Sequence, residues 1–282
     1  MNLDLSIIIV NFNTFELTSK CIKSIYDKVT ELNYEIIVVD NASTEKDPKG
    51  LKDIFPQINL IKSDRNLGFA KGNNLGITQS KGKYILLLNS DCELINNAPL
   101  VSLKYMEENP ECGISTVQLR YPDGKLQYNC RRFRTISWEM LEIIPLYRLL
   151  PKKKKEDLML HHYFGHDRMI DCDWVWGTYM CFRSETIQQL PERKLAEDYF
   201  MYCEDVLWCW QIKQLGLKIT FLPDGKVMHI HKASSKGNNK KVNKMIIKNH
   251  TAFMKRIYPD WRWYIFKFIY TAKQGAISLL SA

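Results

Sequence analysis

Residues 5–13 read LSIIIVNFN, an apolar and largely β-branched run that stops at Asn11. Such a run is typical of a strand buried on both faces of a parallel sheet. Residues 16–28 then place apolar side chains at helical spacing, and residues 35–39 form a second apolar run that ends in Asp40. This order predicts two parallel strands joined by a helix, in the right-handed arrangement that such connections adopt.

The following fifty residues repeat the alternation. We predict a polar helix through Lys52, a strand over 58–61, a helix over 69–79 and a strand over 84–88. The residues that follow the strands are polar, namely Asn11, Asp40 and Asp91. In open α/β sheets, ligands bind in the crevice beyond the carboxyl ends of the strands. The sequence therefore predicts an α/β fold with a mainly parallel open sheet flanked by helices, whose residues 1–100 bind a nucleotide.

The second half of the chain is less regular. An Asp-Gly turn within 121–125 predicts a hairpin, and residues 138–168 are interpreted as a loop-and-helix insertion or cap. An apolar segment resumes over 175–182, and residues 199–215 are consistent with a helix over the sheet. We expect a catalytic domain over 1–240, with an acceptor and catalytic half over 101–240, followed by a helical tail over 241–282.

Composition narrows the class of protein. Hydrophobic residues make up 45% and charged residues 25% of the 282, which excludes a disordered, collagen-like or wholly membrane-embedded chain. The net charge of +9 favours a polyanionic partner, whether nucleic acid, an anionic membrane or a phosphorylated substrate. The eight cysteines form no Cys-x-x-Cys, so we expect reduced, mostly buried thiols instead of a zinc knuckle or a disulfide framework.

The chain carries no recognisable export or membrane-spanning signal. Residues 1–5 lack the cationic start and apolar run of a secretory signal, and no stretch reaches the roughly 18 apolar residues that span a bilayer. We therefore expect a cytoplasmic protein. Peripheral membrane contact stays open.

Four polar motifs follow one another in a specific order. They are IVNFN at 9–13, VVDNAS at 38–43, NLGFAKGNNLG at 66–76 and LNSD at 88–91. In this order they resemble the inverting family 2 glycosyltransferases of the GT-A fold, particularly the bacterial subgroup that includes rhamnosyltransferases. The resemblance covers roughly residues 5–235 and implies a GT-A-type fold, a nucleoside-diphosphate sugar donor and a divalent cation, Mn²⁺ or Mg²⁺.

The resemblance also implies which residues contact the donor. Asn11 and Phe12 match the family positions that contact the nucleobase, and the Phe12 ring can stack on a pyrimidine. Asp40 matches the carboxylate that bonds the base, with a buried, turn-forming aspartate as the structural alternative. Asn73 matches a position beside the donor nucleotide where many relatives carry arginine. Asn89 stands at the first aspartate of the family's Asp-x-Asp motif.

Asp91 and His229 are the metal ligands that the resemblance implies. Asp91 keeps the second aspartate of the motif, and His229 aligns with the histidine that reaches the metal or the diphosphate. His231 is the alternative ligand, and Lys232, Ser234 and Ser235 would hold the leaving diphosphate. The glycines at 68, 72 and 76 recur every four residues and permit close approach of a helix to the sheet.

The most specific catalytic motif is YFMYCEDVLWCW at 199–210. By resemblance Asp205 is the base that deprotonates the acceptor hydroxyl, and Glu204 orients it or contacts the acceptor. The structural alternative is an acidic first helical turn favoured by the helix dipole. Trp174, Trp176 and Gly177 match the segment that lines the sugar and acceptor pocket, although core packing competes with this role for Trp176.

Two further clusters have competing interpretations. His161, His162 and His166, with Asp167, are interpreted as a solvated polar insertion because no metal-ligand pattern completes them. Residues 246–268 mix basic and aromatic side chains, which fits an interfacial helix on an anionic bilayer. A tail that packs its aromatic face on the catalytic domain fits equally well.

The leading hypothesis is a metal-dependent inverting glycosyltransferase at the inner face of the cell membrane. Its donor would be linked to dTDP or UDP, with rhamnose suggested by the subgroup, and its acceptor would be a cell-surface glycan or a lipid-linked precursor. A nucleotidyltransferase would need a glycine-rich, basic triphosphate loop, which residues 11–16 lack. A non-catalytic basic protein that binds nucleic acid or membrane is the third candidate. No nucleic-acid partner is expected, because no recognised module is present.

Overall fold

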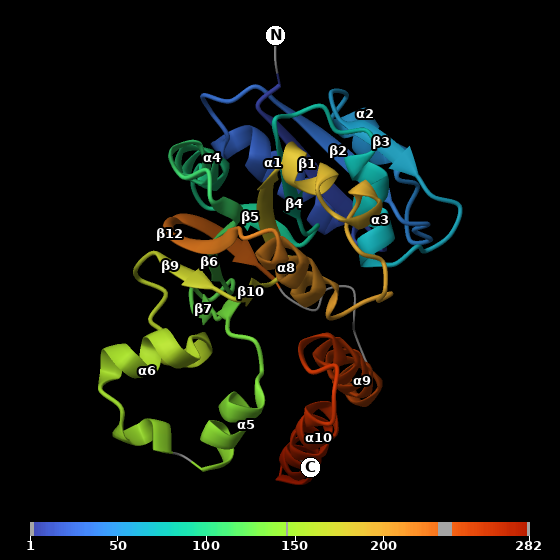
Figure 1. The fold of residues 1–282 in the computed structure, drawn as a ribbon. Helices are drawn as coiled ribbons and strands as arrows, with labels where there is room; N and C mark the ends of the chain where they lie inside the picture. Colours follow the sequence, from blue (N-terminus) through green and yellow to red (C-terminus); the bar gives the residue numbers. More distant parts are fainter. Residues whose placement is uncertain (1–2, 145, 231–238, 281–282) are drawn as a thin grey trace. The chain divides into compact units, whose positions relative to one another are not determined.

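The computed structural model describes residues 3–144, 146–230 and 239–280 (Figure 1). Contacts within the chain define two compact units. Unit 1 comprises residues 1–130 and 166–236, and unit 2 comprises residues 131–165 and 237–282. Most of the predicted insertion and the predicted tail therefore belong to the same unit, although more than seventy residues of sequence separate them.

Unit 1 is built on a mixed sheet. Among the described residues this sheet has ten strands, with the order β3-β2-β1-β4-β11-β6-β12-β5, while β7 pairs with β6 and β9 pairs with β12. The strands are β1 (Leu5–Asn11), β2 (Tyr34–Asp40), β3 (Asn59–Lys62), β4 (Tyr84–Leu88), β5 (Cys92–Leu94), β6 (Cys112–Arg120), β7 (Leu126–Gln127), β9 (Ile170–Cys172), β11 (Tyr179–Arg183) and β12 (Lys218–His229). A separate two-stranded sheet pairs β8 (Cys130–Arg131) with β10 (Trp174–Val175).

The first half of this sheet confirms the predicted parallel arrangement. β1 pairs in parallel with both β2 and β4, and β2 pairs in parallel with β3. Asn11 lies in register with Asp40, so the polar strand ends meet at one edge. The second half is mixed, because β11 runs antiparallel to β4 and β6 whereas β12 runs parallel to β6.

The helices of unit 1 are α1 (Phe15–Lys28), α2 (Lys49–Ile54), α3 (Phe69–Ile77), α4 (Ala98–Glu108), α7 (Ser184–Gln188) and α8 (Glu204–Gln214). Two glycines let α3 lie close to the sheet. A Cβ atom on Gly76 would lie 2.5 Å from Ile8 Cγ2, and one on Gly72 would lie 3.0 Å from Val10 Cγ1. The prediction of close packing on the sheet is confirmed for Gly72 and Gly76, whereas Gly68 precedes α3 and lies against Phe200.

Two local predictions need correction. The helix expected over 199–215 begins only at Glu204, because Tyr202 and Cys203 adopt positive φ angles of 66° and 82° that no helix accommodates. His166, expected in a solvated insertion, is buried in unit 1 against the Phe221 ring. The prediction of buried thiols is confirmed, since all eight cysteines are buried and none of them forms a disulfide.

Unit 2 is helical. It contains α5 (Ile136–Ile143), α6 (Lys152–Met159), α9 (Asn239–Ile257) and α10 (Arg262–Leu280). The fully buried Glu139 of α5 accepts from Arg134 Nε at 2.5 Å and from Lys273 Nζ at 2.6 Å, and so ties α5 to α10. Trp263 Nε1 donates to the Thr251 carbonyl at 2.9 Å and fixes α10 on α9. None of the described helices is long and apolar enough to cross a membrane.

Candidate functional site

A buried polar network lies at the carboxyl ends of β1 and β2. Asn11 Nδ2 donates to Asp40 Oδ1 at 2.7 Å and to Ser43 Oγ at 3.1 Å. Asn11 Oδ1 accepts from the Thr14 and Thr18 hydroxyls, both at 2.9 Å. Asn11 is only 1% exposed, so a side-chain contact with a ligand would have to replace one of these bonds. The structure thus gives Asn11 a positioning role toward Asp40.

Asp40 is buried and forms a turn, as the structural alternative to a base contact predicted. Its Oδ2 accepts the Ser43 backbone N–H at 3.1 Å, which forms the turn that follows β2. The neighbouring Phe12 is only half-buried, so part of its ring is accessible at the same edge of the sheet. Phe12 therefore offers ring surface for a nucleobase contact, whereas Asp40 is only 3% exposed and is held by Asn11 and Ser43.

The two other predicted donor residues have different surroundings. Asn73 is buried in α3, and its Nδ2 donates to the Phe69 carbonyl one turn earlier at 3.0 Å. Asn89 follows β4, and its backbone N–H donates to the Thr178 carbonyl at 3.0 Å. The Asn89 Oδ1 atom is buried without a hydrogen-bond partner among the described residues. A buried acceptor of this kind calls for a ligand or an ordered donor, so Asn89 is the better placed of the two.

Asp91 and His229 are brought together by strand pairing. His229 ends β12 and lies opposite Cys92 of β5, and this pairing sets His229 Nε2 3.2 Å from Asp91 Oδ1. One ligand atom each from Asp91, Cys92 and His229 lie within 4.8 Å of one another. The predicted alternative ligand His231 lies outside the described residues, as do Lys232, Ser234 and Ser235.

Gln127 orients the histidine, and the sequence analysis missed it. Its Nε2 donates to the His229 carbonyl at 2.6 Å, and its Oε1 lies 2.7 Å from His229 Nδ1. With Nδ1–H donating to this oxygen, Nε2 presents a lone pair toward Asp91. Metal-binding histidines are commonly oriented in this way by a partner on the other ring nitrogen. Gln127 lies in β7, which pairs with β6 to form the predicted hairpin, and nothing in the sequence marks it.

The donor set fits a divalent cation. A carboxylate and an imidazole suit Mn²⁺, and a carboxylate with phosphate oxygens suits Mg²⁺. Burial, and next the Asp91 charge, raise the pKa of the Cys92 thiol well above its ordinary value, so this sulfur is a poor ligand for a hard cation. Asp91 and His229 are therefore the two described residues that fit the ion.

Asp205 lies at the start of α8 with both oxygens held by backbone groups. Its Oδ1 accepts from Val206 N at 2.9 Å, and its Oδ2 accepts from Gly177 N at 3.2 Å. A Cβ atom on Gly177 would lie 2.9 Å from Phe69 Cε1 and 3.7 Å from Asp205 Cβ, so only glycine fits there without displacement. The structure thus brings together two predicted site residues, Asp205 and Gly177.

The backbone before Asp205 is strained. Two successive non-glycine residues, Tyr202 and Cys203, adopt left-handed conformations. The segment is tied to α3, because Phe69 N–H donates to the Phe200 carbonyl at 3.1 Å and a Cβ atom on Gly68 would lie 2.4 Å from that oxygen. Strain that the surrounding structure maintains is concentrated at functional sites.

Glu204 has an unusual environment for a carboxyl group. It is buried, and its Oε2 atom has no hydrogen-bond partner among the described residues. Desolvation, and next the Asp205 charge, raise the pKa of Glu204 well above its ordinary range. A neutral Glu204 places no second negative charge beside the Asp205 carboxylate.

The two predicted tryptophans are mainly packed. Trp174 is buried, and Trp176 is half-buried against the hydrophobic core of unit 1. Core packing, the rival interpretation for Trp176, therefore accounts for part of its surface. The remaining exposed part is what is available to a sugar.

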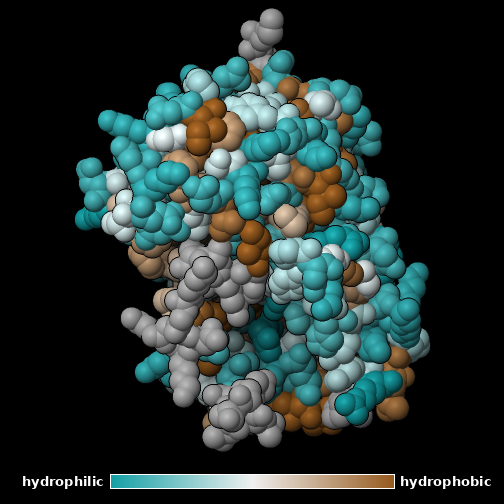
Figure 2. Space-filling model, turned by 180° about the vertical axis from the view of Figure 1, so that it is seen from behind, coloured by the Kyte–Doolittle hydropathy of each residue, from teal (hydrophilic) through white to brown (hydrophobic). Residues whose placement is uncertain are grey.

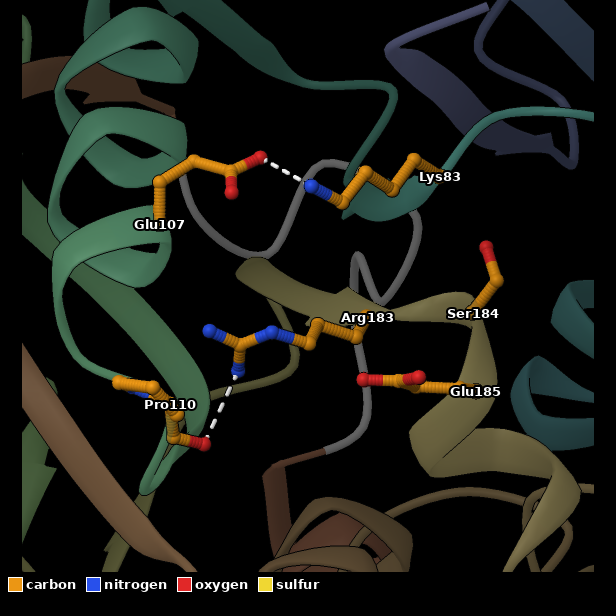
Figure 3. Close-up of a pocket in the computed structure, with 6 residues that line it drawn as sticks. All are labelled: Lys83, Glu107, Pro110, Arg183, Ser184 and Glu185. Carbon is orange, nitrogen blue, oxygen red and sulfur yellow. Dashed lines mark hydrogen bonds and ion pairs between the residues drawn. The ribbon is translucent and has the colours of Figure 1, made fainter.

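A pocket at the opposite edge of the sheet does not belong to this site (Figure 3). It has a volume of about 440 Å³ and lies at the amino end of β4, where Lys83 and Arg183 line it. Lys83 pairs with Glu107 at 2.5 Å, and Arg183 Nη1 donates to the Cys112 carbonyl at 2.6 Å. Both cations therefore already have partners within the fold.

Comparison with known proteins identifies the family. Residues 6–177 match the family described as "Glycosyl transferase family 2". An uncharacterized glycosyltransferase of Rickettsia bellii (strain RML369-C) is 38% identical over 112 residues, which are 37% of this chain and only 15% of that relative. The rhamnosyltransferase WbbL of Escherichia coli (strain K12) is 27% identical over 235 residues, which cover 79% of this chain and 82% of WbbL. The N-acetylglucosaminyl-diphospho-decaprenol L-rhamnosyltransferase of Mycobacterium tuberculosis (strain ATCC 25618 / H37Rv) is 22% identical over 225 residues, covering 74% and 70%.

Solved structures confirm the GT-A-type fold. The mannosyltransferase PcManGT from Pyrobaculum calidifontis, in complex with GDP-Man and Mn²⁺, has a TM-score of 0.61 at 16% identity and covers 97% of this chain and 69% of its own. GalNAc-T7 with UDP, GalNAc and Mn²⁺ has a TM-score of 0.64 at 16% identity and covers 94% and 50%. At these identities the likeness concerns the fold alone.

Proposed function

Since the chain belongs to glycosyltransferase family 2, we propose that it transfers a sugar, with inversion, from a nucleoside-diphosphate donor to a glycan or lipid-linked acceptor. The observation that carries this proposal is the buried Asp91–His229 pair at the carboxyl edge of the sheet, with Gln127 orienting the imidazole. An apolar pair would pack better than a buried carboxylate and imidazole, because burying polar groups costs free energy. A binding role explains why the two are there. They form a site for a cation that carries a diphosphate.

For the donor we propose a dTDP- or UDP-linked sugar, with rhamnose as the first candidate. Support comes from the accessible part of the Phe12 ring beside Asp40, which suits a stacked and hydrogen-bonded pyrimidine. Two relatives, from Escherichia coli and Mycobacterium tuberculosis, are named as rhamnosyltransferases.

The proposed chemistry is a single displacement. Asp91 and His229 would hold Mn²⁺ or Mg²⁺, which neutralises the charge that develops on the leaving diphosphate. The acceptor oxygen forms its bond to the anomeric carbon as the bond from that carbon to the diphosphate breaks, and Asp205 takes the hydroxyl proton. The backbone N–H groups of Gly177 and Val206 hold the Asp205 carboxylate in place. The attack comes from the face opposite the leaving group, so the anomeric centre inverts.

For the acceptor we propose a cell-envelope glycan or its lipid-linked precursor, glycosylated at the cytoplasmic face of the membrane through peripheral contact. The name of the mycobacterial relative includes a diphospho-decaprenol acceptor, which supports a lipid-linked substrate here. A nucleic-acid partner is not part of the proposal.

Thermal stabilisation by donors tests the proposal. The purified chain would be heated with UDP-, dTDP-, GDP- and CMP-sugars, each with and without Mn²⁺, beside Asp91→Ala and the control Asp53→Ala. Asp53 is an exposed residue of α2, far along the chain from the site. We expect one nucleotide family to raise the melting temperature only with Mn²⁺, and Asp91→Ala alone to lose the effect. Equal stabilisation of Asp91→Ala and wild type would exclude the metal assignment.

A further inference from the structure

The net positive charge of the chain comes from unit 2. This unit contains 17 lysine and arginine residues and 5 aspartate and glutamate residues, whereas unit 1 contains 23 and 26. Unit 2 therefore carries a net charge of +12 on 81 residues, and unit 1 is slightly acidic. A run of four lysines at 152–155 begins α6 and is largely exposed. Unit 2 is therefore the part of the chain whose net charge suits an extended anionic surface.

One face of α10 is apolar and exposed. Trp261, Tyr264 and Phe268 are 67%, 69% and 74% exposed, and Ile265 lies among them. Tyr264 and Phe268 are one turn apart on α10, Ile265 lies beside them, and Trp261 directly precedes the helix. We call these four residues the aromatic stripe. Phe266 and Tyr270, on the other side, are buried. The tail thus packs one face within unit 2 and leaves another face uncovered. On the face that Figure 2 draws, hydrophobic residues form several patches among hydrophilic ones.

The aromatic stripe is held in a fixed orientation within unit 2. Lys273 of α10 contacts both Glu139 and Glu142 of α5. Trp263 bonds to α9, and Lys267 Nζ lies 4.9 Å from the centre of its ring. Exposed Arg262 and Lys267 flank the stripe on the same helix. Exposed aromatic and cationic side chains therefore lie together on α10, which is held by contacts with α9 and α5.

We propose that the aromatic stripe and the lysine run 152–155 bind the surface of a bilayer that contains anionic phospholipid. Tryptophan and tyrosine rings favour the interface between headgroups and acyl chains, and lysines near an anionic surface add attraction. No described helix can span a membrane, so the attachment is peripheral. Only the role of this lipid contact, which is to hold the enzyme near a lipid-linked acceptor, rests on the proposed function.

Vesicle flotation with the full chain tests the role of the stripe. The variant Trp261→Ser/Tyr264→Ser/Phe268→Ser would be compared with wild type on phosphatidylcholine vesicles with and without about one third phosphatidylglycerol, at roughly 0.1 M salt. Ile54→Ser/Met169→Ser/Leu215→Ser is the matched control, because these exposed apolar residues belong to unit 1. We expect the stripe variant to bind anionic vesicles at least about tenfold more weakly, and the control to bind like wild type.

A second pair of variants tests the charge and covers the case in which the stripe variant does not fold. Lysines 152–155 would be changed to glutamine, with Lys20, Lys28, Lys52 and Lys104 of unit 1 changed likewise as the control. We expect the first variant to lose about tenfold in binding and most of its dependence on salt, and the second to keep both.

Several outcomes would overturn the proposal. One is equal binding of both stripe and control variants, and another is equal binding of wild type to neutral and anionic vesicles. Concentration-dependent self-association that the stripe variant loses would assign the surface to a second copy of the chain. A lower melting temperature in the stripe variant, with vesicle binding unchanged, would mean that the stripe is covered within the chain.

The same samples separate this proposal from the catalytic one. Metal-dependent stabilisation by a nucleotide sugar would be measured for wild type and for every variant. Vesicle binding without donor binding would leave the lipid surface standing and remove the proposed function. Donor binding without vesicle binding would do the reverse.

Discussion

The two units differ in whether their polar groups are buried or exposed. Unit 1 buries them and connects them, as in the network of Asn11, Asp40 and Ser43 and in the pairing of Asp91 with His229. Unit 2 keeps most of its charge at the surface and leaves the aromatic stripe uncovered. A buried, satisfied network fixes geometry to a fraction of an ångström, which catalysis requires, whereas an interfacial surface requires only area and charge. The comparison agrees with the two proposals, which place the chemistry in unit 1 and the lipid contact in unit 2.

The largest expected effect lies in unit 1. Asp205→Asn keeps the size of the side chain but removes the base, so sugar transfer should fall by about 10³-fold or more. Stabilisation by the donor and Mn²⁺ should persist, because Asp205 holds no part of the proposed cation site. Turnover is measured with Asp224→Asn as the control, an exposed residue of unit 1. Transfer at the wild-type rate would refute the assignment of the base.

A smaller effect is expected from the residue that orients the histidine. Gln127→Leu removes the partner of His229 Nδ1 and should weaken the apparent affinity for Mn²⁺ by about 10–100-fold. The affinity is measured by titration of free Mn²⁺ with donor present. Gln189→Leu, at an exposed position after α7, should leave it unchanged. If both variants bind Mn²⁺ like wild type, His229 is not oriented by Gln127 for metal binding.

Unit 2 should lose stability as pH falls. Burial among Phe253, Phe266 and Tyr270, and next the Arg134 charge, lower the pKa of His250 to about 3 from an ordinary value of 6.5. The folded state therefore keeps His250 neutral, and stability present above pH 6.5 is lost as pH falls toward 3. Between pH 6.5 and 5 the loss is up to about 2 kcal/mol, or about 8–16 °C in the melting temperature of a unit of this size.

The variant His250→Phe isolates this contribution. Its melting temperature should fall less than that of wild type between pH 7 and pH 5, because phenylalanine binds no proton. Lys248→Gln, at an exposed position on the same helix, is the control and should follow wild type. Parallel pH profiles for all three proteins would contradict the assignment.

The smallest expected effect comes from Glu204 of unit 1, whose contribution to stability falls as pH rises and so changes with pH in the opposite direction to that of His250. Because the pKa of Glu204 is raised, the folded state holds a proton that the unfolded state releases above about pH 4.3. The stability that Glu204 contributes is present below that pH and is lost as pH rises toward the raised pKa. Glu204→Gln should therefore flatten the decline of melting temperature on the alkaline side. An unchanged profile would show that Glu204 is ionised in the folded protein.

Much of the nucleotide-binding half could be predicted from the sequence. The apolar runs at 5–10, 35–39 and 84–88 became β1, β2 and β4 with bounds that agree within one residue. A strand that is buried on both faces needs an uninterrupted apolar run, so local sequence is enough to identify it. The order of the motifs at the strand ends then indicated the family, which the match over 6–177 confirms.

What could not be predicted depends on contacts between distant residues. The start of α8 was misplaced because the left-handed backbone at 202 and 203 is maintained by tertiary contacts and not by residue type. Gln127 could not be identified because its partner, His229 of β12, lies 102 residues later in the sequence. The shared unit of 131–165 and 237–282 is likewise a long-range property, although the basic and aromatic composition of the tail was visible. The roles of the individual site residues stay predictions.

The split of unit 2 along the chain has a consequence for biosynthesis. Residues 131–165 are made before the second segment of unit 1, but Glu139 meets Lys273 only after residues 262–280 have been added. Domains fold as units during synthesis as their sequence becomes available. The order of translation therefore lets the sheet and its cation site assemble first, while the helical unit waits for its second half. A nascent chain would form the proposed catalytic site before it forms the proposed lipid-binding surface.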